Sequence, residues 1–393
     1  MTAKCYWMAA LLVLLVGCSS MKNKQREAGK KEWNTARANV LFSLARDQYT
    51  TGNHDKSRQT VNDALAMDPE HAQLRILSAK LYIEQGQLES AEADLKLART
   101  AAPKDPEPDY LTGVIYQRWQ KYEVAYNSYK AASDKAPGEL AYVMARAEML
   151  VAMDRTSEAL QLLLDKVNYF EHSATIRDAA GQLLVEQKRY KEAVDMLRQA
   201  TMLATDDLSI REHLALAMFY AGQNREAADA LTRLTKKEGY AERHDLLAAL
   251  GECQLQLGQY REARSTLETA TQLNPSAPTV WLSLAKAAMQ LNDYKRAEVS
   301  LKKSLAIAPD SSEAHLMCGY LRLRQNRLAE ALPEFKKASA LDQSDTVSLC
   351  MVGFALERLG KPEQAIQYYS RALRLKPNDE MAQKFMASVN LNE

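Results

Sequence analysis

Small apolar residues recur along this chain at a fixed interval. Two columns of them step by 34 residues, shift once by 36, and then resume the interval of 34. The first column comprises Ala45, Ala79, Gly113, Ala147, Gly181, Ala215, Gly251, Ala285, Gly319 and Gly353. The second comprises Ser57, Ala91, Ala125, Ala159, Ala193, Ala227, Ala263, Ala297, Ala331 and Ala365. A period kept over ten copies predicts a repeat architecture.

Prolines and glycines keep the same frame. The prolines that are spaced by the repeat are Pro69, Pro103, Pro137, Pro275, Pro309 and Pro377. A proline lacks an N–H and ends a helix, while glycines such as Gly86 and Gly258 favour a left-handed turn. Each period therefore predicts two helices that approach each other at the small residues. The shift to 36 predicts a two-residue insertion in the loop at 236–240.

These features resemble the tetratricopeptide repeat family, whose unit is a helix–turn–helix of 34 residues. The eighth unit shows the resemblance best, with Trp281, Leu284, Ala285, Tyr294, Ala297 and Pro309. The resemblance implies an all-α fold, a right-handed α-solenoid of about ten units over residues 38–377. Residues 378–393 predict a helix that caps the array, because Met381, Phe385, Met386 and Val389 share one helical face.

Some units depart from the repeat pattern. The fourth unit has Lys166 at a small position and Glu171 where proline is expected, and three later units carry Thr205, Gly239 and Gln343 instead of that proline. We therefore expect a less regular solenoid near residues 140–245.

The N-terminus predicts a lipoprotein. Lys4 precedes an apolar run, from Tyr6 to Val16, that is too short to span a bilayer of ~30 Å. The segment 15–18, Leu-Val-Gly-Cys, resembles the lipobox of bacterial lipoproteins. That resemblance implies a signal peptide at 1–17 and a lipid on Cys18, followed by a flexible basic tether over 18–37. The alternative is an ordinary secretory signal. Ser19, in place of an aspartate, favours the outer membrane, with the protein facing the periplasm.

Composition and motifs argue against several functions. The chain has 51 Lys and Arg against 50 Asp and Glu, so it has no overall field that would attract nucleic acid. Catalytic sequence motifs are absent, and the six histidines have no metal-ligand spacing. Cys253, Cys318 and Cys350 are expected to be buried structural thiols. We therefore expect no enzymatic activity, no cofactor and no metal.

In the family that the chain resembles, the first helices of the units line a concave channel. The candidate partner-binding residues of the last three units are Leu282, Met289, Leu316, Met317, Tyr320, Leu323 and Phe354. Such a zone would suit an amphipathic helix or an extended apolar segment, unless these residues simply pack between units. The candidate acidic residues of the middle units are Glu148, Asp178, Glu186, Glu212, Asp245 and Glu252, unless they are only solvated surface.

Lipid-anchored repeat proteins of this build resemble those of pilus assembly, the PilF and TadD families. The resemblance implies a protein-binding scaffold in the envelope whose partners are a secretin, pilus parts or other envelope proteins. Alternatives within the same class are scaffolds for polysaccharide export or for peptidoglycan enzymes. A hydrolase built on the repeats would need a catalytic constellation that the sequence does not offer.

Overall fold

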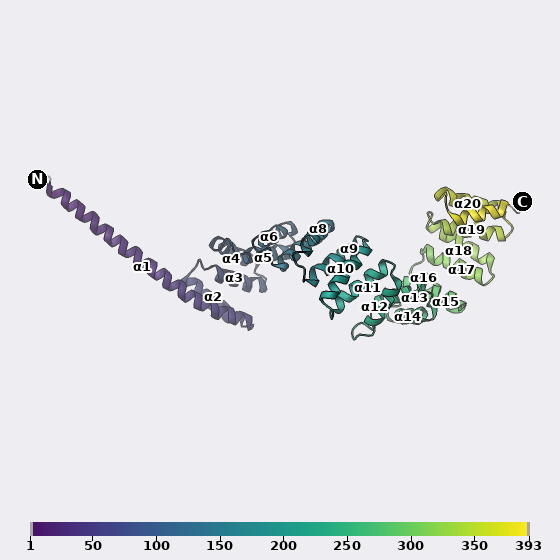
Figure 1. Ribbon diagram of the computed structural model, residues 1–393, viewed down its shortest axis with the longest axis horizontal. Coiled ribbons are helices and arrows are strands. Elements are labelled where there is room, and N and C mark those ends of the chain that lie inside the picture. The colour runs from purple at the N-terminus through teal and green to yellow at the C-terminus, as the bar shows by residue number, and fades with distance from the viewer. Residues whose placement is uncertain (1–2, 391–393) are drawn as a thin grey trace. The chain divides into compact units, whose positions relative to one another are not determined.

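The computed structural model describes the backbone of residues 3–390 and the side chains of residues 25–389 (Figure 1). Within the described range, 21 helices and no strands are present. This architecture confirms the predicted all-α solenoid of paired helices.

Each repeat contributes a first and a second helix. The first helices are α1 (Ala3–Thr50), α3 (Ala72–Glu84), α5 (Glu107–Arg118), α7 (Leu140–Ala152), α9 (Ala174–Glu186), α11 (Leu208–Tyr220), α13 (His244–Gln256), α15 (Pro278–Gln290), α17 (Ser312–Arg324) and α19 (Thr346–Arg358). The second helices are α2 (His54–Met67), α4 (Leu88–Ala101), α6 (Tyr122–Lys135), α8 (Thr156–Val167), α10 (Tyr190–Leu203), α12 (Asn224–Leu234), α14 (Tyr260–Leu273), α16 (Tyr294–Ile307), α18 (Leu328–Leu341) and α20 (Pro362–Leu375). The last helix is α21 (Glu380–Asn390).

The chain divides into two compact units, residues 1–176 and 177–393, and the division falls in the first turn of α9. We call these two parts unit one and unit two, whereas an ordinal, as in the sixth unit, refers to a single repeat. The division lies within the region that the sequence predicts to be less regular. Helix α8 ends at Val167, and a six-residue loop, 168–173, leads to α9.

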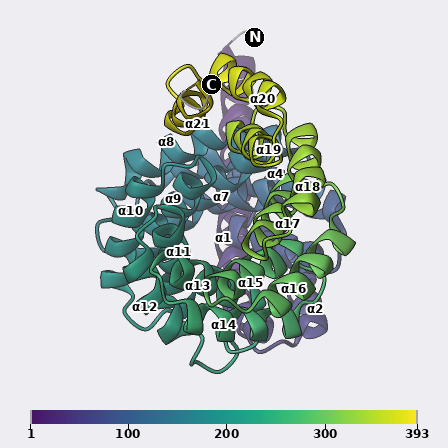
Figure 2. The ribbon, with the colours of Figure 1, turned by 90° about the vertical axis from the view of Figure 1, so that its right-hand side faces the viewer.

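The packing inside unit two explains which helices can form a groove. Successive first helices contact one another, α11 with α13, α13 with α15 and α15 with α17. Figure 2 shows these helices one after another. Among the described residues, successive second helices have no contacts of comparable extent. When successive repeats lie closer together on one side, the array curves toward that side. The first helices therefore line the inner face of unit two.

The predicted insertion lies between α12 and α13. Helix α12 is 11 residues long, whereas α10 and α14 have 14 residues each. The loop that follows α12 covers residues 235–243, in place of the four-residue connection at 204–207. A helix three residues shorter and a loop five residues longer account for the two added residues.

The segment predicted as a flexible tether is helical where the structure describes it. Residues 25–37 belong to α1, and most of their side chains are exposed, including Trp33 at 65%. Their Ala, Glu, Lys and Arg residues are strong helix formers, which accounts for the difference. Contact with the array begins with the exposed ion pair between Lys31 and Glu70 at 3.3 Å, and Asn34 and Thr35 then donate hydrogen bonds to Met67 O and Asp68 Oδ2. The side chain of Cys18 lies outside the described residues.

In the described part of the chain, none of the helices combines the length and the apolar character needed to cross a bilayer.

Helix α21 covers the end of the array as predicted. Asp379 accepts a hydrogen bond from the backbone N–H of Ala382 at 3.0 Å and thereby caps the helix. Val389 is 2% exposed, and the ring of Phe385 lies 5.6 Å from that of Tyr369 in α20. Met381 was predicted on the packed face, but it is 37% exposed. The face that packs on the array is that of Ala382, Phe385, Met386 and Val389, and Met381 points to one side of it.

Candidate partner-binding groove

Two adjoining cavities lie on the inner face of unit two and share Glu252. One has a volume of about 420 Å³ and is lined by α11, α13 and α15, with Val280 and Ser283 among its residues. The other has a volume of about 300 Å³ and is lined by α13, α15 and α17, with Met289 and Met317 facing it. Together these cavities form the candidate groove, which extends over four first helices.

Aromatic side chains stand at the α11 end of the groove. Phe219 and Tyr220 both line it, with ring centroids 5.2 Å apart. Tyr220 is 49% exposed, and its other neighbour is Tyr190, whose ring stacks on it at 5.6 Å. A large, rigid ring that is half exposed offers contact area to a partner at little entropic cost.

The sequence analysis missed Tyr220, although the repeat frame contains a signal for it. Tyr220 is the last residue of α11, five positions after the small residue Ala215. The other units have shorter, polar or charged residues at this position, namely Thr50, Glu84, Arg118, Ala152, Glu186, Gln256, Gln290, Arg324 and Arg358. An aromatic residue in a column that is otherwise polar marks the sixth unit as different.

The acidic candidates are less uniform than the sequence suggests. Glu212 and Asp245 both pair with Arg243, whose Nη2 lies 2.6 Å from Glu212 Oε1 and 2.7 Å from Asp245 Oδ2. The hydrogen bond from Arg243 lowers the pKa of the Asp245 carboxyl below its usual value. Arg243 lies in the lengthened loop, so this pair of carboxylates is partly neutralised rather than free to attract a basic partner.

Two further acidic candidates have polar partners within unit two. Asp178 Oδ1 lies 2.8 Å from His213 Nδ1, and this hydrogen bond raises the pKa of His213 above its usual value. Glu252 accepts a hydrogen bond from Ser283 Oγ at 2.8 Å. Glu252 and Asp245 are the two acidic candidates that line the groove.

The remaining two acidic candidates do not line the groove. Glu148 is exposed, belongs to unit one, and accepts a hydrogen bond from Gln117 Nε2 at 3.0 Å. Glu186 is a residue of α9 that does not line either cavity. The six acidic candidates therefore do not form one continuous acidic zone.

Most of the apolar candidates pack between helices. Leu282 is 5% exposed in the core of α15 and α16. Leu316 and Leu323 are half-buried against the core of α18 to α20, which corrects their expected placement in an open strip. Their repeat positions face the neighbouring unit, whose side chains cover them.

The four aromatic or sulfur-containing candidates divide between packing and cavities. The ring of Tyr320 meets Phe335 edge to face at 5.6 Å and contacts the cores on both sides of α17. Phe354 lines a separate cavity beside α21. Met289, at 9% exposure, and the half-buried Met317 are the two apolar candidates that line the groove.

The three cysteines whose side chains the structure describes have raised pKa values. Burial raises the pKa of Cys253 to about 11 and that of Cys318 and Cys350 to about 12, which keeps the thiols protonated at neutral pH. Cys253 and Cys350 are buried, and Cys318 is half-buried. Among the described residues, no group of three His, Cys, Asp or Glu side chains is placed to hold a metal ion.

Comparison with known families supports the repeat assignment. Tetratricopeptide repeat models match residues 48–114 and 174–207. The model of the cilia and flagella-associated protein 70 C-terminal domain matches residues 205–393, which contain the groove. Residues 48–114 and 174–207 are therefore tetratricopeptide repeats, and the other described helices continue the same paired build of an α-solenoid.

Several solved structures match the chain at low sequence identity and with TM-scores below 0.5. A chain of the APC/C hetero-tetramer Cut9–Hcn1 is 13% identical, with 90% of each chain covered and a TM-score of 0.49. MamA is 17% identical over 42% of this chain and 95% of its own, with a TM-score of 0.38. A thermophilic repeat protein of Thermus thermophilus is 20% identical over 47% of this chain and its full length, with a TM-score of 0.40. The comparison with curated protein sequences gave no match.

Proposed function

We propose that this protein is a non-enzymatic scaffold that holds a segment of a partner protein in the groove of unit two. The observation that carries the proposal is the half-exposed Tyr220 at the end of a groove whose walls also present Val280 and Met289. Aromatic and methionine side chains in a concave surface are typical of sites that receive apolar segments.

The charges along the groove restrict what the segment can be. Lys286 on its wall pairs with Glu313 at 2.7 Å, and Asp245 pairs with Arg243. Because Lys286 and Asp245 already have partners, they favour a segment that binds mainly through apolar side chains. Arg324, which also lines the groove, is exposed and has no ion pair among the described residues, so it can receive one acidic residue of that segment. An amphipathic helix, whose polar face stays in water, meets this requirement.

We further propose that the protein is tethered to the bacterial envelope by a lipid on Cys18. The support is the sequence Leu-Val-Gly-Cys at 15–18, after an apolar run too short to span a bilayer. Two or three acyl chains, at ~0.8 kcal/mol per buried methylene, would hold the scaffold at the membrane permanently. The proposed location is the outer membrane, with the repeats in the periplasm.

Pilus or secretion-system assembly is the pathway that this build favours, and polysaccharide export or the positioning of peptidoglycan enzymes is the alternative. The neighbouring genes separate these pathways. A secretin and a pilin beside the gene support the first, whereas a glycosyltransferase cluster supports export.

A single substitution tests the groove. Tyr220→Ala should leave the helical content and the unfolding midpoint unchanged, yet reduce capture of the principal partner from solubilised envelopes about tenfold or more, as loss of an aromatic hot spot does. The matched control is Tyr169→Ala, because Tyr169 is also well exposed, at 58%, but lies in unit one. Equal capture by both variants would place binding elsewhere on the protein.

A further inference from the structure

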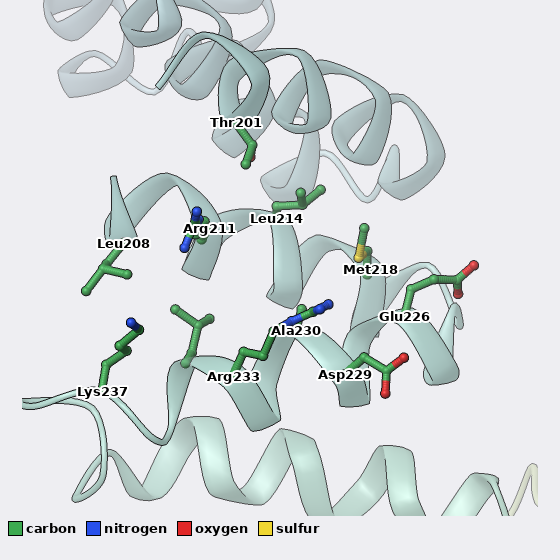
Figure 3. A pocket seen from close by; sticks show the side chains of 11 residues that line it. Thr201, Leu208, Arg211, Leu214, Met218, Glu226, Asp229, Ala230, Arg233 and Lys237 are labelled. Carbon is green, nitrogen blue, oxygen red and sulfur yellow. The ribbon is translucent and has the colours of Figure 1, made fainter. Parts of the chain in front are cut away.

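A second cavity in unit two faces away from the groove. It has a volume of about 480 Å³ and lies between α10, α11 and α12 (Figure 3). Helix α11 contributes Leu214 and Met218 to this cavity, while Phe219 and Tyr220 of the same helix line the groove. At about 100° per residue, these two pairs point to different faces of α11. The α10–α12 pocket is therefore separate from the proposed groove.

The floor of the α10–α12 pocket is apolar. Leu208 and Leu214 are half-buried, and Met218 and Leu234 are 8% and 3% exposed. Apolar exposure continues beside the pocket residue Thr201, since its neighbours along the chain, Met202 and Leu203, are 71% and 42% exposed. A contiguous apolar surface of this kind is unfavourable in water and marks sites of interaction.

The rim of the α10–α12 pocket carries charges of opposite sign at its two ends. Figure 3 shows Arg211 and Lys237 at the end near Leu208, and Glu226 and Asp229 at the end near Met218. Among the described side chains, these four charged groups have neither an ion pair nor a hydrogen bond. Arg233 also lines the pocket without an ion pair among the described residues, and Figure 3 shows it between these two ends. The pocket thus presents three unpaired cations and two unpaired anions around an apolar floor, with the anions gathered at one end.

The corresponding cavity of unit one shows that such a rim is not a general feature of the repeat. The cavity between α4, α5 and α6 has the same place in its unit, but several of its polar groups are paired. Tyr116 donates a hydrogen bond to Glu92 at 2.6 Å, and Arg99 pairs with Asp109 at 2.8 Å, whereas Glu89 and Lys96 of α4 have no ion pair among the described residues. Helix α6 contributes only Val124 and Ser128, and Val124 stands at the repeat position of Glu226, so the anionic end of the α10–α12 pocket has no counterpart on α6.

The two-residue insertion supplies part of the rim. Helix α12 ends at Leu234, three residues before the repeat position at which the 14-residue second helices end. Lys237 therefore belongs to the lengthened loop and not to the helix. The departure from the repeat period thus places a cation at one end of the α10–α12 pocket.

We propose that the α10–α12 pocket binds an amphipathic helix of a partner protein, with a carboxylate at the Arg211 and Lys237 end and a cation at the Glu226 and Asp229 end. The two ends lie about as far apart as Arg211 and Met218, which are seven residues apart on α11. That separation is about 10 Å, or two helical turns. In the bound helix the acidic residue and the basic residue are seven positions apart, at i and i+7. The apolar residues that face the floor of the pocket lie between them, at i+3 and i+4. Together with the groove, this site makes the scaffold a bridge between two protein segments.

A library of stapled helical peptides of about twelve residues tests the proposal. The positions i, i+3, i+4 and i+7 are randomised, and the peptides are selected on the full mature chain and counter-selected on its Lys237→Glu variant. We expect the selected peptides to carry an acidic and a basic residue at the two outer positions, and Leu, Met or Phe at the inner ones.

Single variants then measure the contribution of the rim. Lys237→Glu should weaken binding of the selected peptide about tenfold, because the attraction between Lys237 and the acidic residue of the peptide becomes a repulsion. A peptide whose acidic residue is replaced by lysine should regain that affinity on the variant. The matched control is Lys236→Glu, an exposed neighbour that does not line the pocket, and it should leave the affinity unchanged. Tyr220→Ala should also leave it unchanged, which separates this site from the proposed groove.

Three outcomes would overturn the proposal. The first is a selection whose peptides bind equally well to Lys236→Glu and Lys237→Glu. The second is a set of peptides with no charge pattern at the outer positions. The third is self-association of the purified chain that Lys237→Glu abolishes, since the occupant would then be a second copy of the protein.

Discussion

Gly113 in α5 lies against the ring of Tyr129 in α6 so closely that a Cβ on the glycine would stand 2.5 Å from Tyr129 Cε1. Tyr129 is 1% exposed, and its hydroxyl donates a hydrogen bond to Gln117 Oε1 at 2.6 Å. The ring is therefore held from both sides and cannot move to admit a methyl group. The same close approach recurs between Gly319 and Phe335 and between Gly353 and Tyr369, so a glycine accompanies each of these rings.

Gly113→Ala should therefore destabilise the protein. Overpacking costs about 1–3 kcal/mol, and the better helix propensity of alanine returns ~1 kcal/mol, so we expect a net loss of about 1 kcal/mol. Urea unfolding measures it. The control is Gly29→Ala in α1, where nothing lies within 4 Å of the added carbon. The double variant Gly113→Ala, Tyr129→Leu has the residue pair that the preceding repeat has at Ala79 and Leu95. Its loss of stability should be smaller than the sum of the losses of the two single variants.

The repeat frame could be predicted from the sequence because small residues at a fixed period have one simple structural cause, the close approach of two helices in each repeat. What each small residue faces could not be predicted without the helix pairing. The pairing places Gly113, Gly319 and Gly353 opposite rings, but Gly181 and Gly251 lie just as close to Leu197 and Leu267, so the size of the partner alone does not decide where glycine occurs.

The groove was harder to predict because exposure depends on how far neighbouring side chains reach. Leu282 and Met317 both belong to first helices, yet the core of α15 and α16 covers Leu282 while Met317 faces a cavity. Arg243 directly precedes α13, where the following repeats have Ala277, Ser311 and Asp345. The repeat frame fixes this position but not the residue type, so the contact of Glu212 with an arginine is specific to this repeat.

Tyr320 and Tyr220 should respond differently to the same substitution. Tyr320→Glu introduces a carboxylate among Phe335 and the neighbouring cores, so we expect a loss of about 2–4 kcal/mol in urea unfolding. Tyr220→Glu changes a half-exposed residue and should alter stability by no more than ~0.5 kcal/mol. Hydrogen exchange should rise in α17 and α18 of the first variant. Unchanged exchange there would mean that Tyr320 is free to bind a partner after all.

The lipid anchor can be tested at Cys18. Cys18→Ala should leave the precursor uncut and abolish labelling by palmitate, because the acyl group is attached through the thiol at that position. The matched control is Cys5→Ala, which removes the other cysteine of the N-terminal segment and should leave labelling and processing intact. Palmitate on the Cys18→Ala variant would exclude the lipobox, and processing without palmitate in the wild-type chain would indicate an ordinary secretory signal.

The contact between His213 and Asp178 should make the stability of unit two depend on pH. The hydrogen bond to Asp178 is the largest cause that raises the pKa of His213, and the charges of Glu212 and Asp207 add to it. The folded protein thus holds the imidazolium proton more tightly than the unfolded chain, whose histidine has a pKa of about 6.5. Stabilisation is complete below that pH and is lost as the pH rises through the raised pKa.

We therefore expect hydrogen exchange in α11 to be slowest, after correction for the intrinsic rate, at pH values below about 6.5 and to accelerate above it. His213→Gln should remove this pH dependence, since glutamine does not titrate. His172→Gln is the matched control, because that side chain is 88% exposed and lies in unit one, and it should retain the wild-type profile. A wild-type profile in His213→Gln as well would assign the pH dependence of α11 to another group.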